Sequence, residues 1–389
     1  KALLVPGVLF DELGFRYFGP IDGHDVNELV KTLNNIKNIN QPVLLHIITK
    51  KGKGLVSTSE KNGEYHRDAV KYHAVKPSQN NGELKKSNET KTPSFQDVFG
   101  FLSCEVARNR KDTICITAAM REGTGLVPYA KEFPDRYYDV GIAEGHGVTF
   151  SAGFATEGLR PIVAIYSTFL QRAFDHIVHD VAIQHLPVIF CMDRSGIAGE
   201  DGPTHHGSLD IPYLRCIQDM IVSAPRNGNE FRHLLYSALN QKEAPFSIRY
   251  PKSSAVEFDS DGQAELLPIG SWEVLRTGSD VVVLSVGPLC YNVERAAEVL
   301  HNNNISVEIV NCRFIKPMDE SYLKSLIERF ENVVTIEEGV VIGGFGDGVS
   351  SWLLENGFQG RIKRLGLPDS FVQHGKREEL LSEVRLDEN

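Results

Sequence analysis

The sequence is poor in several features that would assign a protein to a special class. No uninterrupted apolar run reaches the roughly 18 residues that a bilayer-spanning helix needs. Basic residues are not in excess either, because 41 Lys and Arg stand against 51 Asp and Glu and the formal net charge is −10. An acidic balance provides no electrostatic surface for nucleic acid or for an anionic membrane. We therefore expect no nucleic-acid partner and no membrane association.

Cysteine is scarce and is nowhere arranged for pairing. The six cysteines are scattered, none forms a CxxC motif, and several, such as Cys191, lie in apolar strand-like runs. In a chain of 389 residues this distribution is typical of reduced core thiols, and we predict a cytoplasmic protein. The chain also has no initiator Met and no signal-like segment where it begins, Lys1-Ala2-Leu3. We expect that it was processed or that it is a piece of something longer.

The sequence does contain short apolar strands that alternate with helical patterns. Such alternation predicts an α/β fold with parallel sheets covered on both faces. Near the start, a helical stretch from Val26 to Ile36 precedes an apolar run over 42–48, and a segment typical of an exposed linker comes later. The expected organisation is a first unit over 1–76, a linker over 77–93, a second unit over 94–255, a linker over 256–268 and a third unit over 269–389.

Apolar runs predict the strands of the two later units. In the second unit they cover Thr113 to Ile116, Tyr138 to Gly141, Pro161 to Tyr166 and Leu186 to Met192. Helices are expected between them, over Val148 to Glu157 and over Phe169 to Gln184. In the third unit the expected strands cover Val281 to Ser285, Ser306 to Val310 and Val333 to Ile336.

Glu144 and His146 lie two residues apart where a predicted strand runs into a turn and then a helix. Ligands of open α/β sheets bind at the carboxyl ends of strands, which makes Glu144 a candidate functional carboxylate. A structural role is the alternative: a carboxylate at a helix N-terminus is favoured by the helix dipole, with a histidine as its partner. From the residues alone both interpretations stay open.

A second cluster follows the next predicted strand and combines Tyr166, Phe169 and Arg172. Arginine is the usual bidentate ligand of phosphate or carboxylate groups, so this cluster is a candidate anion site. Pairing of Arg172 with a nearby acid is an equally good interpretation.

The third candidate is the loop from Asp193 to Gly207, which is long, polar and rich in glycine. A loop of this kind after a buried strand is more often functional than structural. Its adjacent His205 and His206 raise the question of a metal site. Successive loop residues tend to point apart, and no Cys or acidic triad accompanies them, so we predict no metal here.

Two weaker motifs have simpler explanations. The glycine-rich run Gly343–Gly348 resembles a phosphate loop, but it is not GxGxxG and has no following Lys-Ser or Lys-Thr, so a tight turn at the start of a helix is expected. His176 and His179 are expected on an ordinary helix face.

Together, Glu144, Arg172 and His205 and their surroundings resemble the 1-deoxy-D-xylulose-5-phosphate synthases, thiamine diphosphate enzymes of the transketolase group. The matching stretches also include Gly19 to Asp25, Thr49 to Gly52, Ala119 to Gly123, Phe133 to Tyr137, Ala164 to Ala173, Asp201 to His205, Tyr213 to Cys216, Arg249 to Pro251 and Gly366 to Asp369. The resemblance implies the tail of a diphosphate-binding domain whose front part is missing, then a pyrimidine-binding parallel-sheet domain and a transketolase C-terminal-like α/β domain. It also implies a homodimer.

The activity that this resemblance implies is condensation of pyruvate with D-glyceraldehyde 3-phosphate. The reaction releases CO2 and gives 1-deoxy-D-xylulose 5-phosphate for isoprenoid, thiamine and pyridoxal biosynthesis. By resemblance, Glu144 hydrogen-bonds the aminopyrimidine ring of thiamine diphosphate and favours its imino tautomer, while Phe169 and Met120 also contact the cofactor. His73 and His205 match histidines placed for proton transfer.

The substrate pocket that the resemblance implies is formed by residues from several segments. They are Tyr166, Arg172, Arg194, Asp201, Arg249 and Lys252.

The sequence departs from the family pattern at four positions. Gly145 replaces the usual Gln after the glutamate, Gly147 replaces an Ala, and Leu55 stands where an aromatic residue is common. Lys252 stands where the family often has Arg, which keeps the charge and loses the bidentate fork.

The motif that binds magnesium in this group, Gly-Asp-Gly followed further on by Asn, is missing. The single Gly-Asp-Gly is Gly346–Gly348, and no Asn occurs between 357 and 388. We therefore expect no metal ligand on this chain and expect the Mg2+ ligands in the missing amino-terminal part.

Two alternatives to the synthase are kept. One is another thiamine enzyme, such as a transketolase or the β subunit of a 2-oxo acid dehydrogenase. The other is a non-catalytic regulatory relative, against which the intact Glu144, Arg172 and His205 argue.

Overall fold

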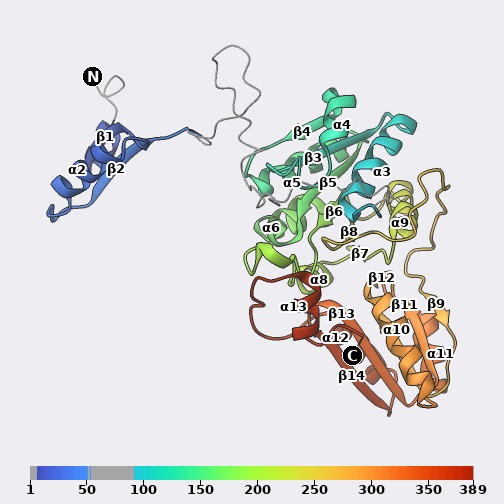
Figure 1. The fold of residues 1–389 in the computed structure, drawn as a ribbon. Coiled ribbons are helices and arrows are strands. Elements are labelled where there is room, and N and C mark those ends of the chain that lie inside the picture. Colours follow the sequence, from blue (N-terminus) through green and yellow to red (C-terminus); the bar gives the residue numbers. More distant parts are fainter. Residues whose placement is uncertain (1–6, 51–52, 54–91, 389) are drawn as a thin grey trace, which may run out of the picture. The chain divides into compact units, whose positions relative to one another are not determined.

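The structure, a computed structural model, describes residues 7–50, 53 and 92–388, which belong to two units divided between residues 88 and 89. Leu55, His73 and nearly all of the predicted linker over 77–93 lie outside the described residues. The described part of the first unit contains α1 (Val8–Glu12), β1 (Arg16–Asp22), α2 (Val26–Ile36) and β2 (Val43–Ile48) (Figure 1).

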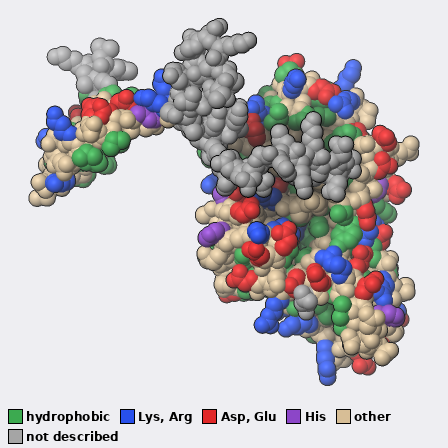
Figure 2. All heavy atoms as spheres, viewed as in Figure 1, with side chains coloured by type: hydrophobic (Ala, Val, Ile, Leu, Met, Phe, Trp, Pro, Cys, Tyr) green, Lys and Arg blue, Asp and Glu red, His purple; other side chains and the backbone are tan. Residues whose placement is uncertain are grey.

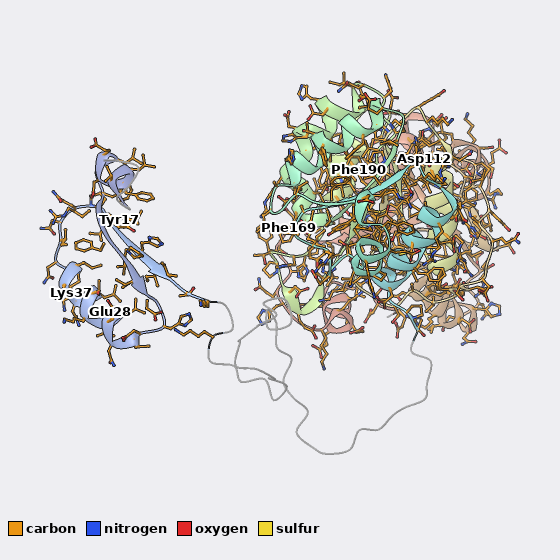
Figure 3. All side chains as sticks on the ribbon, turned by 90° about the horizontal axis from the view of Figure 1, so that it is seen from above. Tyr17, Glu28, Lys37, Asp112, Phe169 and Phe190 are labelled. Carbon is orange, nitrogen blue, oxygen red and sulfur yellow. The ribbon has the colours of Figure 1, made fainter. Side chains whose placement is uncertain are left out.

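The first unit is built around two parallel strands, β1 and β2. Helix α2 begins after Asp25, whose side chain accepts a hydrogen bond from the Glu28 backbone N–H at 3.0 Å. Tyr17 on β1, labelled in Figure 3, has its hydroxyl 2.7 Å from Nδ1 of His46 on β2. The helix predicted from Val26 to Ile36 is confirmed, and the apolar run over 42–48 forms β2.

The second unit contains a seven-stranded sheet in the order β12-β7-β8-β6-β5-β3-β4. Its strands are β3 (Thr113–Thr117), β4 (Tyr137–Asp139), β5 (Arg160–Tyr166), β6 (Ile189–Asp193), β7 (Ile221–Ser223), β8 (Phe246–Arg249) and β12 (Phe314–Lys316). All neighbours are parallel except β12, which pairs antiparallel with β7. Because β12 comes from the third expected unit, the two later units share one sheet.

The helices of this region are α3 (Phe95–Asn109), α4 (Val127–Glu132), α5 (Glu144–Thr156), α6 (Ser167–Leu170), α7 (Phe174–His176), α8 (Asp210–Arg215) and α9 (Gly228–Asn240). The single helix predicted over Phe169 to Gln184 is wrong. After α6 the chain forms a 3-10 turn over Gln171–Ala173, then α7, then a π-helix over Ile177–Ala182.

The broken segment still buries one side. Ala173, Ile177 and Val181 are all buried and follow one another at a spacing of four, which keeps them on one face of a helical segment. The apolar pattern therefore predicted a helical segment here but not its division into 3-10, α and π turns.

A five-stranded sheet in the order β14-β13-β10-β11-β9 follows, parallel except for the edge strand β9. Its strands are β9 (Glu273–Arg276), β10 (Val281–Ser285), β11 (Val307–Asn311), β13 (Asn332–Val340) and β14 (Arg361–Leu367). The accompanying helices are α10 (Leu289–Asn302), α11 (Glu320–Arg329), α12 (Phe345–Glu355) and α13 (Arg377–Glu383). The predicted α/β class with mostly parallel sheets is confirmed.

One large hydrophobic cluster runs through both sheets of the second unit. Phe190 of β6, labelled in Figure 3, belongs to it together with Leu284 of β10. Five of the six cysteines are buried and all six are free, and only Cys216 is exposed. On the face shown in Figure 2, acidic and basic side chains of the second unit are interspersed. No helix among the described residues is long and apolar enough to cross a membrane.

Candidate active site

Glu144 and Arg172 form an ion pair at the carboxyl edge of the seven-stranded sheet. Glu144 is the first residue of α5, where the helix dipole favours a negative charge. Its side chain is only 2% exposed, and Oε1 accepts a hydrogen bond from Nη1 of Arg172 at 2.5 Å. The Arg172 side chain is 55% exposed, so one side of the pair faces solvent. The pairing of Arg172 with an acid, which the sequence left open, is therefore present, and the acid is Glu144.

Three rings lie next to this pair. Tyr166 ends β5 and stacks on Phe169 of α6 with ring centroids 5.7 Å apart. His205 meets Phe169 edge-on at 5.4 Å, and the Arg172 guanidinium lies 4.9 Å from the centroid of the same ring. Burial raises the pKa of Tyr166 to about 12, so its phenol remains protonated at neutral pH.

Arg194 lies on the other side of Tyr166. Its guanidinium carbon is 3.8 Å from the Tyr166 ring centroid, and Nη1 donates to the Gly123 carbonyl at 2.8 Å. A side chain at Gly123 would overlap the Tyr166 hydroxyl, so this close approach requires glycine. The backbone φ of Arg194 is +61°, a left-handed conformation that is uncommon and costly for arginine.

Asp193 was not among the predicted site residues, although it directly precedes Arg194. Its Oδ1 lies 3.1 Å from Nη1 of Arg194, and its Oδ2 is buried without a hydrogen-bond partner. Burial raises the pKa of this carboxyl to about 6 against the opposing effect of the Arg194 charge. The signal that could have identified it is a lone acid at the end of an otherwise apolar strand.

Asp201 and Lys252 form a second ion pair near the loop, with Nζ 2.7 Å from Oδ2. Burial acts to raise the pKa of Asp201, but the hydrogen bond and charge of Lys252 outweigh it and hold the pKa below its usual value. On the same loop, Nδ1 of His205 lies 2.9 Å from the Thr204 hydroxyl. Met120 lies under the site, with its sulfur 3.3 Å from the backbone nitrogen of Tyr166.

Arg249 is not brought to this group. Nε and Nη2 contact the two Asp210 oxygens at 3.0 and 3.2 Å, and Nη2 also donates to the Glu338 carbonyl at 2.8 Å. The Arg249 guanidinium therefore lies in a buried ion pair. The predicted role of Arg249 in substrate binding stays a prediction. The same holds for His73, which lies outside the described residues.

The two adjacent histidines point to different partners. Nδ1 of His206 accepts the Ala198 backbone N–H at 2.9 Å, so its Nε2 carries the proton, 3.1 Å from the Gln373 carbonyl. His205 instead meets Phe169. Within residues 7–50, 53 and 92–388 no group of three or more His, Cys, Asp or Glu side chains could hold a metal ion.

The departures from the family pattern also have structural counterparts. The ring of His176 lies against Gly145, with Cε1 2.6 Å from the position that a Cβ would take.

The predicted turn at the start of a helix is confirmed for Gly343–Gly348, because α12 starts within it and the Asp347 carboxylate accepts the Gly343 N–H.

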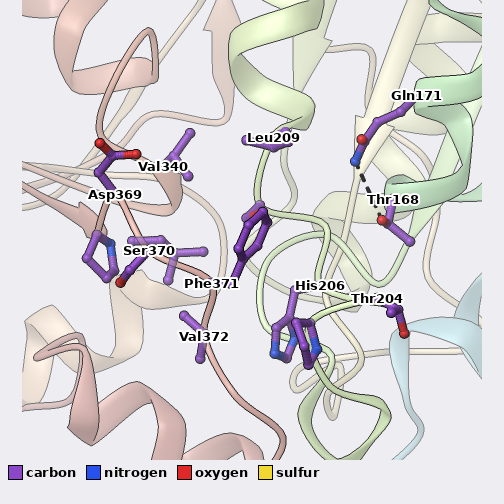
Figure 4. A pocket seen from close by; sticks show the side chains of 14 residues that line it. Thr168, Gln171, Thr204, His206, Leu209, Val340, Asp369, Ser370, Phe371 and Val372 are labelled. Atoms are coloured by element: carbon purple, nitrogen blue, oxygen red, sulfur yellow. Dashed lines mark hydrogen bonds between the residues drawn. The ribbon is translucent and has the colours of Figure 1, made fainter.

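A cavity of about 380 Å3 lies beside the site, between the 203–209 segment and the segment after β14 (Figure 4). Side chains from both segments line it, among them Thr204 and His206 on one side and Phe371 and Val372 on the other.

The residues present fit the aminopyrimidine half of thiamine diphosphate. A heteroaromatic ring with an amino group needs an acceptor for its ring edge and an apolar face to pack on. The buried Glu144 carboxylate and the stacked Tyr166 and Phe169 rings are this combination.

Comparisons with known proteins agree with this geometry. Residues 91–256 match the family model of the transketolase pyrimidine binding domain, and residues 270–389 match that of the transketolase C-terminal domain. A solved split-gene transketolase, described as an inactive β4 tetramer, superposes with a TM-score of 0.67 at 26% identity and covers 76% of this chain and 95% of its own. A Pichia stipitis transketolase shares the fold at 17% identity and a TM-score of 0.63, over 76% of this chain and 44% of its own. The fold and the site thus define a transketolase-type α/β protein.

More specific matches narrow this class. Residues 1–49 match the 1-deoxy-D-xylulose-5-phosphate synthase family model. The synthase of Aquifex aeolicus is 48% identical over 388 residues, and that of Carboxydothermus hydrogenoformans is 46% identical over 389 residues. Both alignments cover 100% of this chain but only 60% and 61% of the relatives. Over its full length the chain is similar to the 1-deoxy-D-xylulose-5-phosphate synthases, and it spans about 60% of the length of these curated relatives.

Proposed function

We propose that this chain forms the pyrimidine side of the active site in an enzyme that condenses pyruvate with D-glyceraldehyde 3-phosphate, releasing CO2 and giving 1-deoxy-D-xylulose 5-phosphate. The observation that supports the proposal most is the convergence of Glu144, Arg172 and Phe169 with Arg194 and His205 at one sheet edge. Names of relatives up to 48% identical point to the same activity.

Bound thiamine diphosphate would supply the nucleophilic carbon and the electron sink for loss of CO2. The chain's own part is to bind and orient. Glu144 would accept a hydrogen bond from the aminopyrimidine ring and favour its imino tautomer, and Arg172 keeps the carboxylate in place. Phe169 would pack on the face of the pyrimidine, with Met120 behind Tyr166.

The loop side of the site would bind the acceptor substrate. Arg194 and Lys252 are the cations suited to the phosphate of D-glyceraldehyde 3-phosphate, and Asp201 orients the lysine. His205 would donate or accept the proton at the carbonyl oxygen, since imidazole titrates near neutral pH. His73 is proposed to act with it.

The remaining proposals concern the assembly, its metal and its location. We place the Mg2+ ligands on residues outside this chain, because its single Gly-Asp-Gly, Gly346–Gly348, is not followed by the Asn of the family's magnesium motif. A homodimer is supported by the exposed apolar side chains of Ile142 and Phe174, which flank Glu144 and Arg172 in sequence. A cytoplasmic location is supported by the free, mostly buried cysteines.

Glu144→Ala in the complete enzyme tests the catalytic assignment. Loss of tautomer control should be worth several kcal/mol, so turnover should fall by far more than about tenfold. Glu157→Ala, at the opposite end of α5, is the matched control and should keep turnover within about twofold. If turnover of Glu144→Ala stays within about tenfold of wild type, the assignment is wrong.

A second candidate, ketol transfer between sugar phosphates, is favoured by the match to 95% of a split-gene transketolase chain. Assaying both reactions with the same preparation separates the two, because only the synthase releases CO2 from pyruvate.

A further inference from the structure

The loop between β6 and α8 carries three residues of the candidate site and contains little regular structure. Arg194, Asp201 and His205 lie on it, and two backbone hydrogen bonds of 2.7 and 2.8 Å join its two arms. The first arm, Asp193 to Gly199, is nevertheless buried throughout. Side chains of the C-terminal sheet and its helices contribute to this burial.

Ile197, in the first arm, inserts into the core of the C-terminal sheet. It is fully buried and belongs to one hydrophobic cluster with Leu289 of α10, Ile336 of β13 and Leu380 of α13. A loop of the pyrimidine-binding domain thus depends on the C-terminal domain for its apolar anchor.

The backbone of Ile197 is held on both sides. The Glu338 carboxylate of β13 accepts its N–H at 2.6 Å, and Nη1 of Arg377 donates to its carbonyl at 2.8 Å. Arg377 and Glu338 also pair with each other, Nη2 to Oε2 at 2.5 Å, and their side chains are only 13% and 5% exposed. A side chain at Gly196, whose φ is +80°, would overlap the Glu338 carboxylate. The close approach of the loop to Glu338 therefore requires glycine at position 196.

The second arm is held as well. His206 accepts the Ala198 N–H and lies 3.1 Å from the Gln373 carbonyl, so it links the two arms to the segment before α13. Gly202 lies against His374, whose Cβ is 3.1 Å from where a Gly202 Cβ would be. His206 also lines the cavity of Figure 4, where the loop faces the segment after β14.

We propose that Glu338 and Arg377 are positioning residues through which the C-terminal domain holds the site loop, and thereby sets the affinity for the phosphorylated aldehyde. The inference rests on the proposed function, because that function assigns the loop to this substrate. The Glu338 and Arg377 side chains act through Ile197, while the Glu338 backbone carbonyl also accepts a hydrogen bond from Arg249.

Glu144 and Phe169 lie on α5 and α6, outside the loop, and His205 of the loop meets the edge of the Phe169 ring. We therefore expect cofactor affinity to change much less than affinity for the aldehyde.

Arg377→Met in the complete enzyme should raise the KM for D-glyceraldehyde 3-phosphate about tenfold while thiamine diphosphate affinity stays within about twofold. Arg377→Lys should restore part of the loss. The single variant leaves the Glu338 carboxylate buried without its counter-charge, and the double variant Arg377→Met/Glu338→Gln removes that charge. The double variant replaces the single variant in the KM measurement if the single variant does not fold. Arg295→Met is the matched control, because Arg295 pairs with Glu388 at 3.3 Å on the surface of the same domain.

An unchanged KM in the folded double variant would overturn the inference, as would an equal loss of cofactor affinity, which marks general loosening. Hydrogen exchange on the chain itself gives a readout that needs no activity. In Arg377→Met, amides of 196–207 should exchange about tenfold faster while those of β5 do not change, and in Arg295→Met neither should change. If the wild-type enzyme lacks synthase activity, the proposed function is wrong. The hydrogen-exchange measurement then still tests whether Glu338 and Arg377 position the loop. Unchanged exchange over 196–207 would refute it.

Discussion

Replacing Arg249 by Met should damage the stability of the second unit more than its binding of substrate. Arg249 and Asp210 are 5% and 0% exposed and share two contacts of 3.0 and 3.2 Å. Removing the guanidinium leaves the Asp210 carboxylate buried without its counter-charge, which typically costs about 3–5 kcal/mol. At a urea dependence of about 3 kcal/mol per molar, this lowers the unfolding midpoint by about 1–1.7 M.

Urea unfolding followed by fluorescence of Trp272 and Trp352 measures this loss. The double variant Arg249→Met/Asp210→Asn should lose much less than the sum of the single variants, because neither charge is then left unpaired. Arg108→Met is the matched control. Its pair with Glu132 is exposed at 2.6 Å, and loss of such a pair costs at most about 1 kcal/mol.

The result that would refute this reasoning is specific. If Arg249→Met keeps its midpoint within about 0.3 M of wild type and instead raises the KM of one substrate, then Arg249 binds substrate and the buried pair is energetically unimportant.

Three further outcomes are expected. Burial raises the pKa of Glu337 from 4.5 to about 7; the folded chain therefore retains a proton that the unfolded chain releases between these values, and this carboxyl lowers stability as pH rises through that window. The free energy of unfolding of Glu337→Gln should therefore exceed that of wild type by more at pH 8 than at pH 5. An equal difference at the two pH values would contradict the burial argument. Gly145→Gln should lose about 1–3 kcal/mol in thermal unfolding, because His176 occupies the space; His176→Ala should relieve most of the loss, and a neutral Gly145→Gln would count against the contact. The chain by itself should bind thiamine diphosphate weakly in calorimetry, with no response to Mg2+; tight, Mg2+-dependent binding would place the metal ligands on this chain.

The local sequence pattern was sufficient to predict an element whose buried face does not depend on which element packs against it. The strand from Val281 to Ser285 and the helix from Val26 to Ile36 have the predicted bounds, because their apolar periodicity is a property of the segment alone. The same logic marked Glu144 and the Tyr166–Arg172 segment as two separate candidates at the carboxyl ends of strands, and only the family resemblance placed them in one site.

Local pattern could not decide which distant groups an arginine contacts. Arg194 follows β6 and Arg249 ends β8, so the two look alike in sequence, yet one lies over Tyr166 and the other is buried against Asp210. The answer depends on partners 71 and 39 residues away, whose approach is set by the packing of whole elements.

What the sequence by itself determined was therefore the α/β class and most of the strands, because these depend on periodicity and composition over short segments. The grouping of the site side chains came from the family resemblance. The tertiary structure alone decided that β12 joins the preceding sheet and that Glu338 and Arg377 hold a loop 141 and 180 residues earlier in the chain. These contacts form only when segments far apart in the chain pack against each other, and no short stretch of sequence contains both sides.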